Sequence, residues 1–199
     1  MRRTVGGVLA TCPPFAQDRP LVEAAVQFAE RAHARQRRES DAAPFLLHPL
    51  EVAALLAGRG HDDEVVAAGV LHDVVEKTDA TPGEVRERFG DRTADLVATV
   101  TEDPAIADYL ARKAALREQV EGAGPDALAV YAADKLAKSR ELRAQAARDQ
   151  AALDEPGLER RLHHYQESLA LLERAAPDSP LAVQLRFELW ALEQLPPGR

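Results

Sequence analysis

The stretch Gly69-Val70-Leu71-His72-Asp73-Val74-Val75-Glu76-Lys77-Thr78 carries the most informative side chains of this chain. If residues 64–76 are helical, His72, Asp73 and Glu76 can point at one small volume, because positions three and four apart share a helix face. Neutral imidazole and carboxylate are the ligand types expected for a divalent first-row metal. A further carboxylate nearby could orient water on that metal. The stretch therefore predicts a metal site on a helix.

The rest of the sequence predicts an all-α fold. Apolar residues recur at spacings of three and four, and no sustained alternation indicates a strand. Proline fits the first helical position, where its missing N–H would be unpaired in any case. Thr81 and Glu84 have the spacing of a capping box. The prolines that we expect at helix starts are Pro20, Pro49, Pro82, Pro104, Pro125, Pro156 and Pro180.

Composition excludes several classes of protein. The 199 residues are 46% hydrophobic but only 5% aromatic, so the core must be built from Ala, Leu and Val. The net charge of −8 argues against binding to a nucleic acid polymer. No apolar run approaches the roughly 20 residues that span a bilayer, so we expect no membrane association. A single cysteine, Cys12, favours a reducing, cytoplasmic location.

One domain is expected. Residues 1–18 combine proline, glycine and polar side chains without a period, which predicts a poorly ordered N-terminal segment. Residues 19–195 show neither an internal repeat nor a low-complexity linker, and we assign them to a single helical domain. The oligomeric state stays open.

Two other positions could complete the metal site. His48 precedes Pro49 at the mouth of an expected helix, where its side chain can project into a cleft. Asp134 lies in an otherwise apolar helical stretch, and a buried carboxylate needs a partner such as a metal ion. The alternative for Asp134 is a salt bridge to Lys135 or Lys138 at a helix surface. Either histidine taken alone could equally be a capping or core residue.

The order His48, His72-Asp73, Asp134 resembles the H…HD…D pattern of the HD-domain metal-dependent phosphohydrolases. The likeness is greatest to the alarmone hydrolase domain of the RelA/SpoT enzymes and of the small Mesh-type hydrolases, and it covers roughly residues 22–145. The matching segments are Phe45–Ala53, Gly69–Thr78, Phe89-Gly90, Leu96–Thr101 and Ala133–Leu136 followed by Arg140.

The resemblance implies a compact multi-helix HD-domain fold that binds Mn²⁺, with another divalent metal possible. The implied ligands are His48, His72, Asp73 and Asp134. The implied reaction is hydrolysis of the 3′-pyrophosphate of guanosine tetra- or pentaphosphate, with Glu76 as the residue that orients or deprotonates the attacking water. The alternative for Glu76 is a solvated helix residue paired with Arg86 or a neighbour.

Basic residues suit an anionic nucleotide substrate. Clusters of them precede His48 and follow Asp134, where phosphate binding is electrostatically favourable, although such runs are usually solvated faces. The clusters are Arg31, Arg35, Arg37 and Arg38, and then Lys135, Lys138, Arg140 and Arg143. By resemblance, Arg38 matches an arginine that stacks on guanine, and Lys113 matches a lysine that contacts phosphate.

Three positions depart from the family pattern. Lys77 replaces the second carboxylate of a catalytic Glu-Asp pair, Glu39 replaces a lysine, and Lys138 replaces an asparagine. Lys77 could hold a phosphate oxygen instead of activating water. The leading hypothesis is thus a metal-dependent phosphohydrolase acting on a nucleotide, with Glu76 and Lys77 as catalytic residues and Arg38, Lys113 and Lys138 as substrate-binding residues. The alternatives are a catalytically altered nucleotide-binding or sensor protein, and a helical protein whose His-Asp pair is incidental.

Overall fold

The computed structural model describes residues 11–148 and 157–195. Within these ranges the chain is helical, and its one β-type feature is an isolated bridge between Arg37 and Pro44. The all-α prediction is confirmed. None of the helices in the described ranges is both long and apolar enough to span a bilayer. The chain divides into two compact units, Met1–Thr101 and Glu102–Arg199, and each is described separately below.

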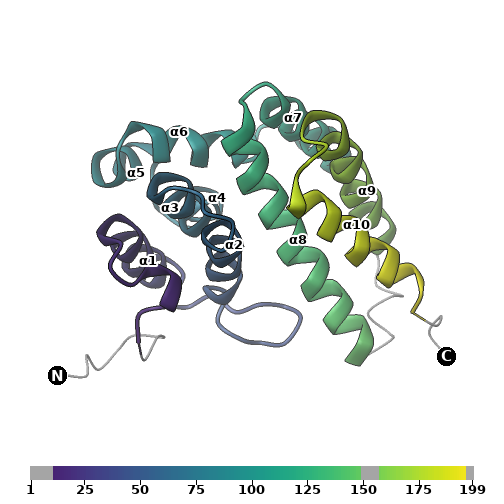
Figure 1. Cartoon of the computed structure of the whole chain (residues 1–199), viewed down its shortest axis with the longest axis horizontal. Coiled ribbons are helices and arrows are strands. Elements are labelled where there is room, and N and C mark those ends of the chain that lie inside the picture. Colours follow the sequence, from purple (N-terminus) through teal and green to yellow (C-terminus); the bar gives the residue numbers. More distant parts are fainter. Residues whose placement is uncertain (1–10, 149–156, 196–199) are drawn as a thin grey trace. The chain divides into compact units, whose positions relative to one another are not determined.

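The first unit contains a short 3₁₀ helix and six α-helices (Figure 1). Their bounds are η1 Pro14–Ala16, α1 Pro20–Ala32, α2 Leu47–Ala57, α3 Asp63–Leu71, α4 Val74–Lys77, α5 Pro82–Phe89 and α6 Asp91–Val100. At its centre lies α3, in which every residue from Val65 to Leu71 is buried. A helix that is apolar on all sides needs neighbours on all sides, and α3 contacts α1, α2 and α6.

Gly69 allows α2 and α3 to pack closely. A Cβ atom at this position would lie 2.6 Å from Leu56 Cδ1 and 3.4 Å from Ala53 Cα, both on α2. Leu56 is itself fully buried and has little space into which to move. The absence of a side chain at Gly69 therefore sets the spacing of two helices that each carry a candidate ligand.

The second unit consists of α7 Tyr109–Glu121, α8 Pro125–Arg148, α9 Leu158–Ala175 and α10 Pro180–Glu193. The long helix α8 contacts α7, α9 and α10, and Figure 1 shows α10 lying alongside it. Glu188 of α10 is 5% exposed and accepts hydrogen bonds from the guanidinium groups of Arg140 and Arg143 on α8. These two arginines, which the sequence places in a cluster suited to phosphate, link α8 to α10.

Most of the expected helix starts are confirmed. Pro20, Pro82, Pro125 and Pro180 are the first residues of α1, α5, α8 and α10. The Thr81 hydroxyl accepts the amide N–H of Glu84 at 3.2 Å, as the capping spacing predicted. Two expectations were wrong: Pro49 lies inside α2, and Pro104 begins no helix, because Asp108 caps α7 by accepting the Ala111 N–H. Pro156 lies outside the described residues.

The domain boundaries expected from sequence stay a prediction. Residues 1–10 of the expected N-terminal segment lie outside the described residues. The remainder of that segment includes η1, whose Ala16 is fully buried against the first unit.

Candidate functional site

The His-Asp pair lies at a break between two helices, not inside one. Helix α3 ends at Leu71, His72 is its C-cap, and Asp73 is the N-cap of α4. The expectation of one helix over residues 64–76 was therefore wrong. Asp73 has φ −97° and ψ −6°, in the sparsely populated bridge region where many active-site residues lie. The break redirects the two adjacent side chains toward a common point.

Three side chains of the first unit converge there. His48 Nε2 lies 3.3 Å from His72 Nε2, and Asp73 Oδ2 lies 3.7 Å and 3.4 Å from these two nitrogens. The three residues are 3% to 4% exposed. The helix geometry explains the meeting: His48 is the second residue of α2, and Gly69 brings α2 close to α3.

This donor set fits a divalent cation. His72 Nδ1 lies 2.9 Å from the carbonyl oxygen of Gly69, which can only accept, so the ring proton is on Nδ1. His72 Nε2 then presents a lone pair toward His48 and Asp73. Ligand atoms about 2.1 Å from one ion lie roughly 3.0 to 3.5 Å apart, close to the separations found here. The unit thus contains a buried His-His-Asp cluster suited to a metal.

Glu76 and Lys77 follow one turn later on α4. Their side chains are 31% and 34% exposed, and Lys77 Nζ lies 3.3 Å from Glu76 Oε1. Lys77 Nζ also lies 3.9 Å from Asp73 Oδ1. The cation at the position of the expected second carboxylate therefore interacts with both a candidate ligand and the candidate catalytic glutamate.

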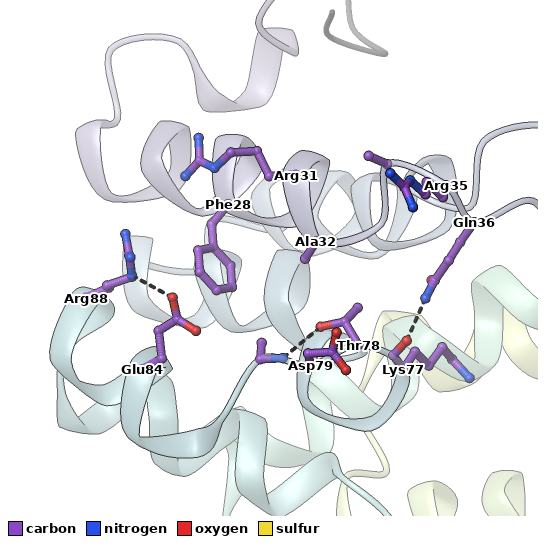
Figure 2. A pocket seen from close by; sticks show the side chains of 12 residues that line it. Phe28, Arg31, Ala32, Arg35, Gln36, Lys77, Thr78, Asp79, Glu84 and Arg88 are labelled. Atoms are coloured by element: carbon purple, nitrogen blue, oxygen red, sulfur yellow. Dashed lines mark hydrogen bonds and ion pairs between the residues drawn. The ribbon is translucent and has the colours of Figure 1, made fainter.

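A pocket of about 640 Å³ opens beside Lys77 (Figure 2). Arg31 of α1 and Arg35, which follows the end of α1, lie on its wall, and both belong to the basic cluster noted from sequence. Gln36, which also lines the pocket, is held at both ends of its amide: its Nε2 donates to the Lys77 carbonyl at 2.5 Å, and its Oε1 lies 2.7 Å from His33 Nδ1. The complete lining is Phe28, Arg31, Ala32, Ala34, Arg35, Gln36, Lys77, Thr78, Asp79, Ala80, Glu84 and Arg88.

Arg38 lies in the loop between α1 and α2. Its amide donates to the Ala43 carbonyl at 2.8 Å, and its guanidinium forms a two-pronged ion pair with Asp41. The side chain is 18% exposed. Asp41 thus pairs with the edge of the Arg38 guanidinium. The stacking on a base that the resemblance implied would use the flat face of the same group.

The other expected site residues belong to the second unit. Asp134 Oδ2 accepts from Lys135 Nζ at 2.6 Å, and Asp134 Oδ1 lies 3.0 Å from Lys138 Nζ. Both ion pairs of the alternative interpretation are therefore formed. The role of Asp134 as a fourth ligand stays a prediction. Lys113 pairs with Glu102, and its ammonium lies 5.3 Å from the centre of the Tyr109 ring.

Three lysines of the second unit, on α7 and α8, interact electrostatically with one another. Burial and then the nearby charge of Lys135 lower the pKa of Lys113. Burial would also lower the pKa of Lys135, but Asp134 more than offsets it and the pKa is raised. Glu102 is partly desolvated, yet its hydrogen bond and ion pair with Lys113 keep its pKa below the usual value. Lys135 is 3% exposed, which the sequence gave no reason to expect.

Residues 25–159 match the family described as HD domain. The chain belongs to the HD domain family. The human guanosine-3′,5′-bis(diphosphate) 3′-pyrophosphohydrolase MESH1 is 40% identical over 125 residues, which are 61% of this chain and 69% of MESH1. The corresponding enzyme of Aquifex aeolicus is 42% identical over 94 residues. The resemblance seen in the sequence is confirmed.

The coverage of these relatives differs widely. The match to the Aquifex protein covers 47% of this HD domain protein but only 13% of the Aquifex protein. The match to a Synechocystis relative covers 41% of this chain and 10% of that relative. Among solved structures, one described as a metazoan ortholog of SpoT that hydrolyses ppGpp has a TM-score of 0.73 at 26% identity. It covers 94% of this chain and 100% of that one. The Listeria monocytogenes protein lmo0812 has a TM-score of 0.65 at 31% identity, over 74% and 94% of the two chains.

Proposed function

We propose that this HD domain is a Mn²⁺-dependent phosphohydrolase that removes the 3′-pyrophosphate of guanosine tetra- or pentaphosphate, or of a related nucleotide. The observation that carries the proposal is the convergence of His48, His72 and Asp73 at one buried point, 3.3 to 3.7 Å apart. The names of the MESH1 and Aquifex relatives support the choice of substrate.

In this proposal His48, His72, Asp73 and Asp134 hold the ion. When bound, a divalent ion supplies a nucleophile at neutral pH and polarises a phosphoryl oxygen. Glu76, one turn after Asp73 and 31% exposed, accepts a proton from the attacking water. Because imidazole and carboxylate oxygen suit several first-row metals, the choice of manganese rests on the family resemblance.

The charges of the second unit support an anionic substrate. Lys113, Lys135 and Lys138 interact electrostatically with one another, and we assign Lys113 and Lys138 to the substrate phosphates. In the first unit, Arg38 would contact the base, and Lys77 would hold a phosphate oxygen. The Lys77 ammonium would offset the repulsion between that phosphate oxygen and the carboxylates of Asp73 and Glu76, which both lie within 3.9 Å of it.

A second candidate function is a nucleotide sensor without turnover. The contact of Lys77 Nζ with Glu76 Oε1 at 3.3 Å favours it, since the ammonium pairs with a carboxylate oxygen that the proposed base would use to accept a proton. Such a protein would bind metal and nucleotide and release no product.

The test is to incubate the Mn²⁺-loaded protein with guanosine tetraphosphate and to follow pyrophosphate release, with Asp73→Ala as the control. We expect release that is lost in the variant. Release at the same rate in Asp73→Ala would overturn the metal site. Metal and nucleotide binding without release would overturn the hydrolase in favour of the sensor, and Lys77→Asp then tests whether the lysine blocks turnover.

A further inference from the structure

The neighbours of His164, on α9, determine which nitrogen of its ring carries the proton. Its side chain is 2% exposed, and Arg117 NH1 of α7 lies 3.0 Å from its Nδ1. A guanidinium can only donate, so Nδ1 must accept. A neutral His164 therefore carries its proton on Nε2.

The surroundings keep the ring neutral. Burial lowers the pKa of His164, and the charges of four cations lower it further: Lys135, Lys113, Arg117 and Lys138. A second proton would add a fifth positive charge to this group. The tautomer with hydrogen on Nε2 is thus the state present around neutral pH.

That Nε2–H has no hydrogen-bond partner among residues 11–148 and 157–195, and the atom is buried from solvent. A buried donor left unpaired costs about 1–3 kcal/mol, so such groups are uncommon unless a ligand satisfies them. The ring is positioned through its other nitrogen, because Arg117 NH1 lies 3.0 Å and Ser168 Oγ lies 3.5 Å from His164 Nδ1.

We propose that the Nε2–H of His164 binds an anionic oxygen of the substrate's phosphate groups, beside Lys113, Lys135 and Lys138. This inference rests on the proposed function for its ligand class. Glu102 pairs with Lys113, and Asp134 pairs with both Lys135 and Lys138, so two carboxylates face three ammonium groups and a further acceptor at this point is favoured if it is an anion. A neutral donor strengthens phosphate binding without adding to the repulsion among the lysines.

Two substitutions separate the roles of the two ring nitrogens. In His164→Asn the side-chain oxygen can still accept from Arg117 near the Nδ1 position, but no atom reaches the Nε2 position. In His164→Gln the amide nitrogen reaches the Nε2 position and keeps a donor there. His163→Gln is the matched control, because His163 is the adjacent residue and is exposed.

The readout is the affinity of the full-length protein for inorganic pyrophosphate, measured by calorimetry. We expect binding about tenfold weaker in His164→Asn, since a hydrogen bond to a charged group is lost. His164→Gln should stay within about threefold of wild type, and His163→Gln should match it. Equal affinity of His164→Asn and wild type would overturn the inference.

A second measurement does not depend on the variants folding. In wild-type protein the ¹⁵N signals of His164 should show the Nε2–H tautomer and should shift when pyrophosphate is added. The Nδ1–H tautomer, or signals unmoved by saturating pyrophosphate, would overturn the inference. Neither measurement requires turnover. A failure to hydrolyse guanosine tetraphosphate would contradict the proposed function, and the affinity for pyrophosphate would still test the role of His164 independently.

Discussion

His48 Nε2 lies 3.3 Å from His72 Nε2, although 24 residues separate the two histidines in the sequence. One lies in the first turn of α2 and the other at the end of α3. Imidazole nitrogens that face each other at about this distance can both coordinate one divalent cation. Asp73 adds a carboxylate on the same side.

Gly69→Ala should destabilise the protein. The added methyl group would lie 2.6 Å from Leu56 Cδ1, and overpacking of this kind costs about 1–3 kcal/mol of unfolding free energy. Urea unfolding measures the change. Gly83→Ala on α5 is the control, because the nearest atom to its new methyl would be 3.9 Å away, and we expect it to be neutral or stabilising by up to about 1 kcal/mol. Equal stability of the two variants would show that Gly69 does not set the helix spacing.

Lys77→Met should tighten Mn²⁺ binding about threefold to tenfold. The substitution keeps a long side chain but removes a positive charge 3.9 Å from Asp73 Oδ1, and like charges repel. Titration with Mn²⁺ followed by electron paramagnetic resonance measures the free ion. Arg31→Met, which removes a cation from the wall of the neighbouring pocket, should change the affinity less. Weaker binding in Lys77→Met would mean that the lysine supports the site.

Glu188→Ala should lower the unfolding free energy by about 1–2 kcal/mol. Breaking a fully buried ion pair costs about 3–5 kcal/mol. Here Arg140 and Arg143 are 34% and 39% exposed, so water can partly replace the lost carboxylate. Glu173→Ala, which removes the partner of Arg186 in an exposed ion pair, should cost no more than about 1 kcal/mol. If Glu188→Ala lost affinity for pyrophosphate without losing stability, Arg140 and Arg143 would have to be phosphate-binding residues and not a stabilising link between the helices.

Stability should fall in acid partly through His164. Its pKa is lowered in the folded protein, so below about pH 6.5 the unfolded chain takes up a proton that the folded chain does not. The unfolding free energy then decreases as the pH falls through this value, by about 1.4 kcal/mol at pH 5.5 for this one group. Urea unfolding at pH 7.5 and 5.5 should show the decrease reduced by that amount in His164→Gln.

His163→Gln controls for the loss of one imidazole from the unfolded chain in the same experiment. An unchanged pH dependence in His164→Gln would show that the buried ring is protonated in the folded state. That outcome would also contradict the tautomer on which the anion-binding inference depends.

The fold class and the family could both be predicted from the sequence. The local signals were proline at helix starts, the Thr81 cap and the three-and-four apolar spacing. They predicted the starts of α1, α5, α8 and α10 without knowledge of the neighbouring segments, and proline misled only at Pro49 and Pro104 among the described residues. His48, His72 and Asp73 were predictable because their residue types and order match a family pattern.

The pairing of charges and the burial of individual groups could not be predicted, because both depend on the packing of helices against one another. In the sequence, Arg140 and Arg143 cannot be told apart in role from Lys138, since all three are cations that follow Asp134. The arginines pair with Glu188, a residue more than 40 positions away on another helix. His164 and His163 are adjacent and chemically identical, yet one is buried against Arg117 and the other is exposed. The break between α3 and α4 has no local signal either, since neither a proline nor a glycine lies between Leu71 and Val74. Pairing, desolvation and helix breaks depend on contacts between distant segments, and a local pattern does not contain them.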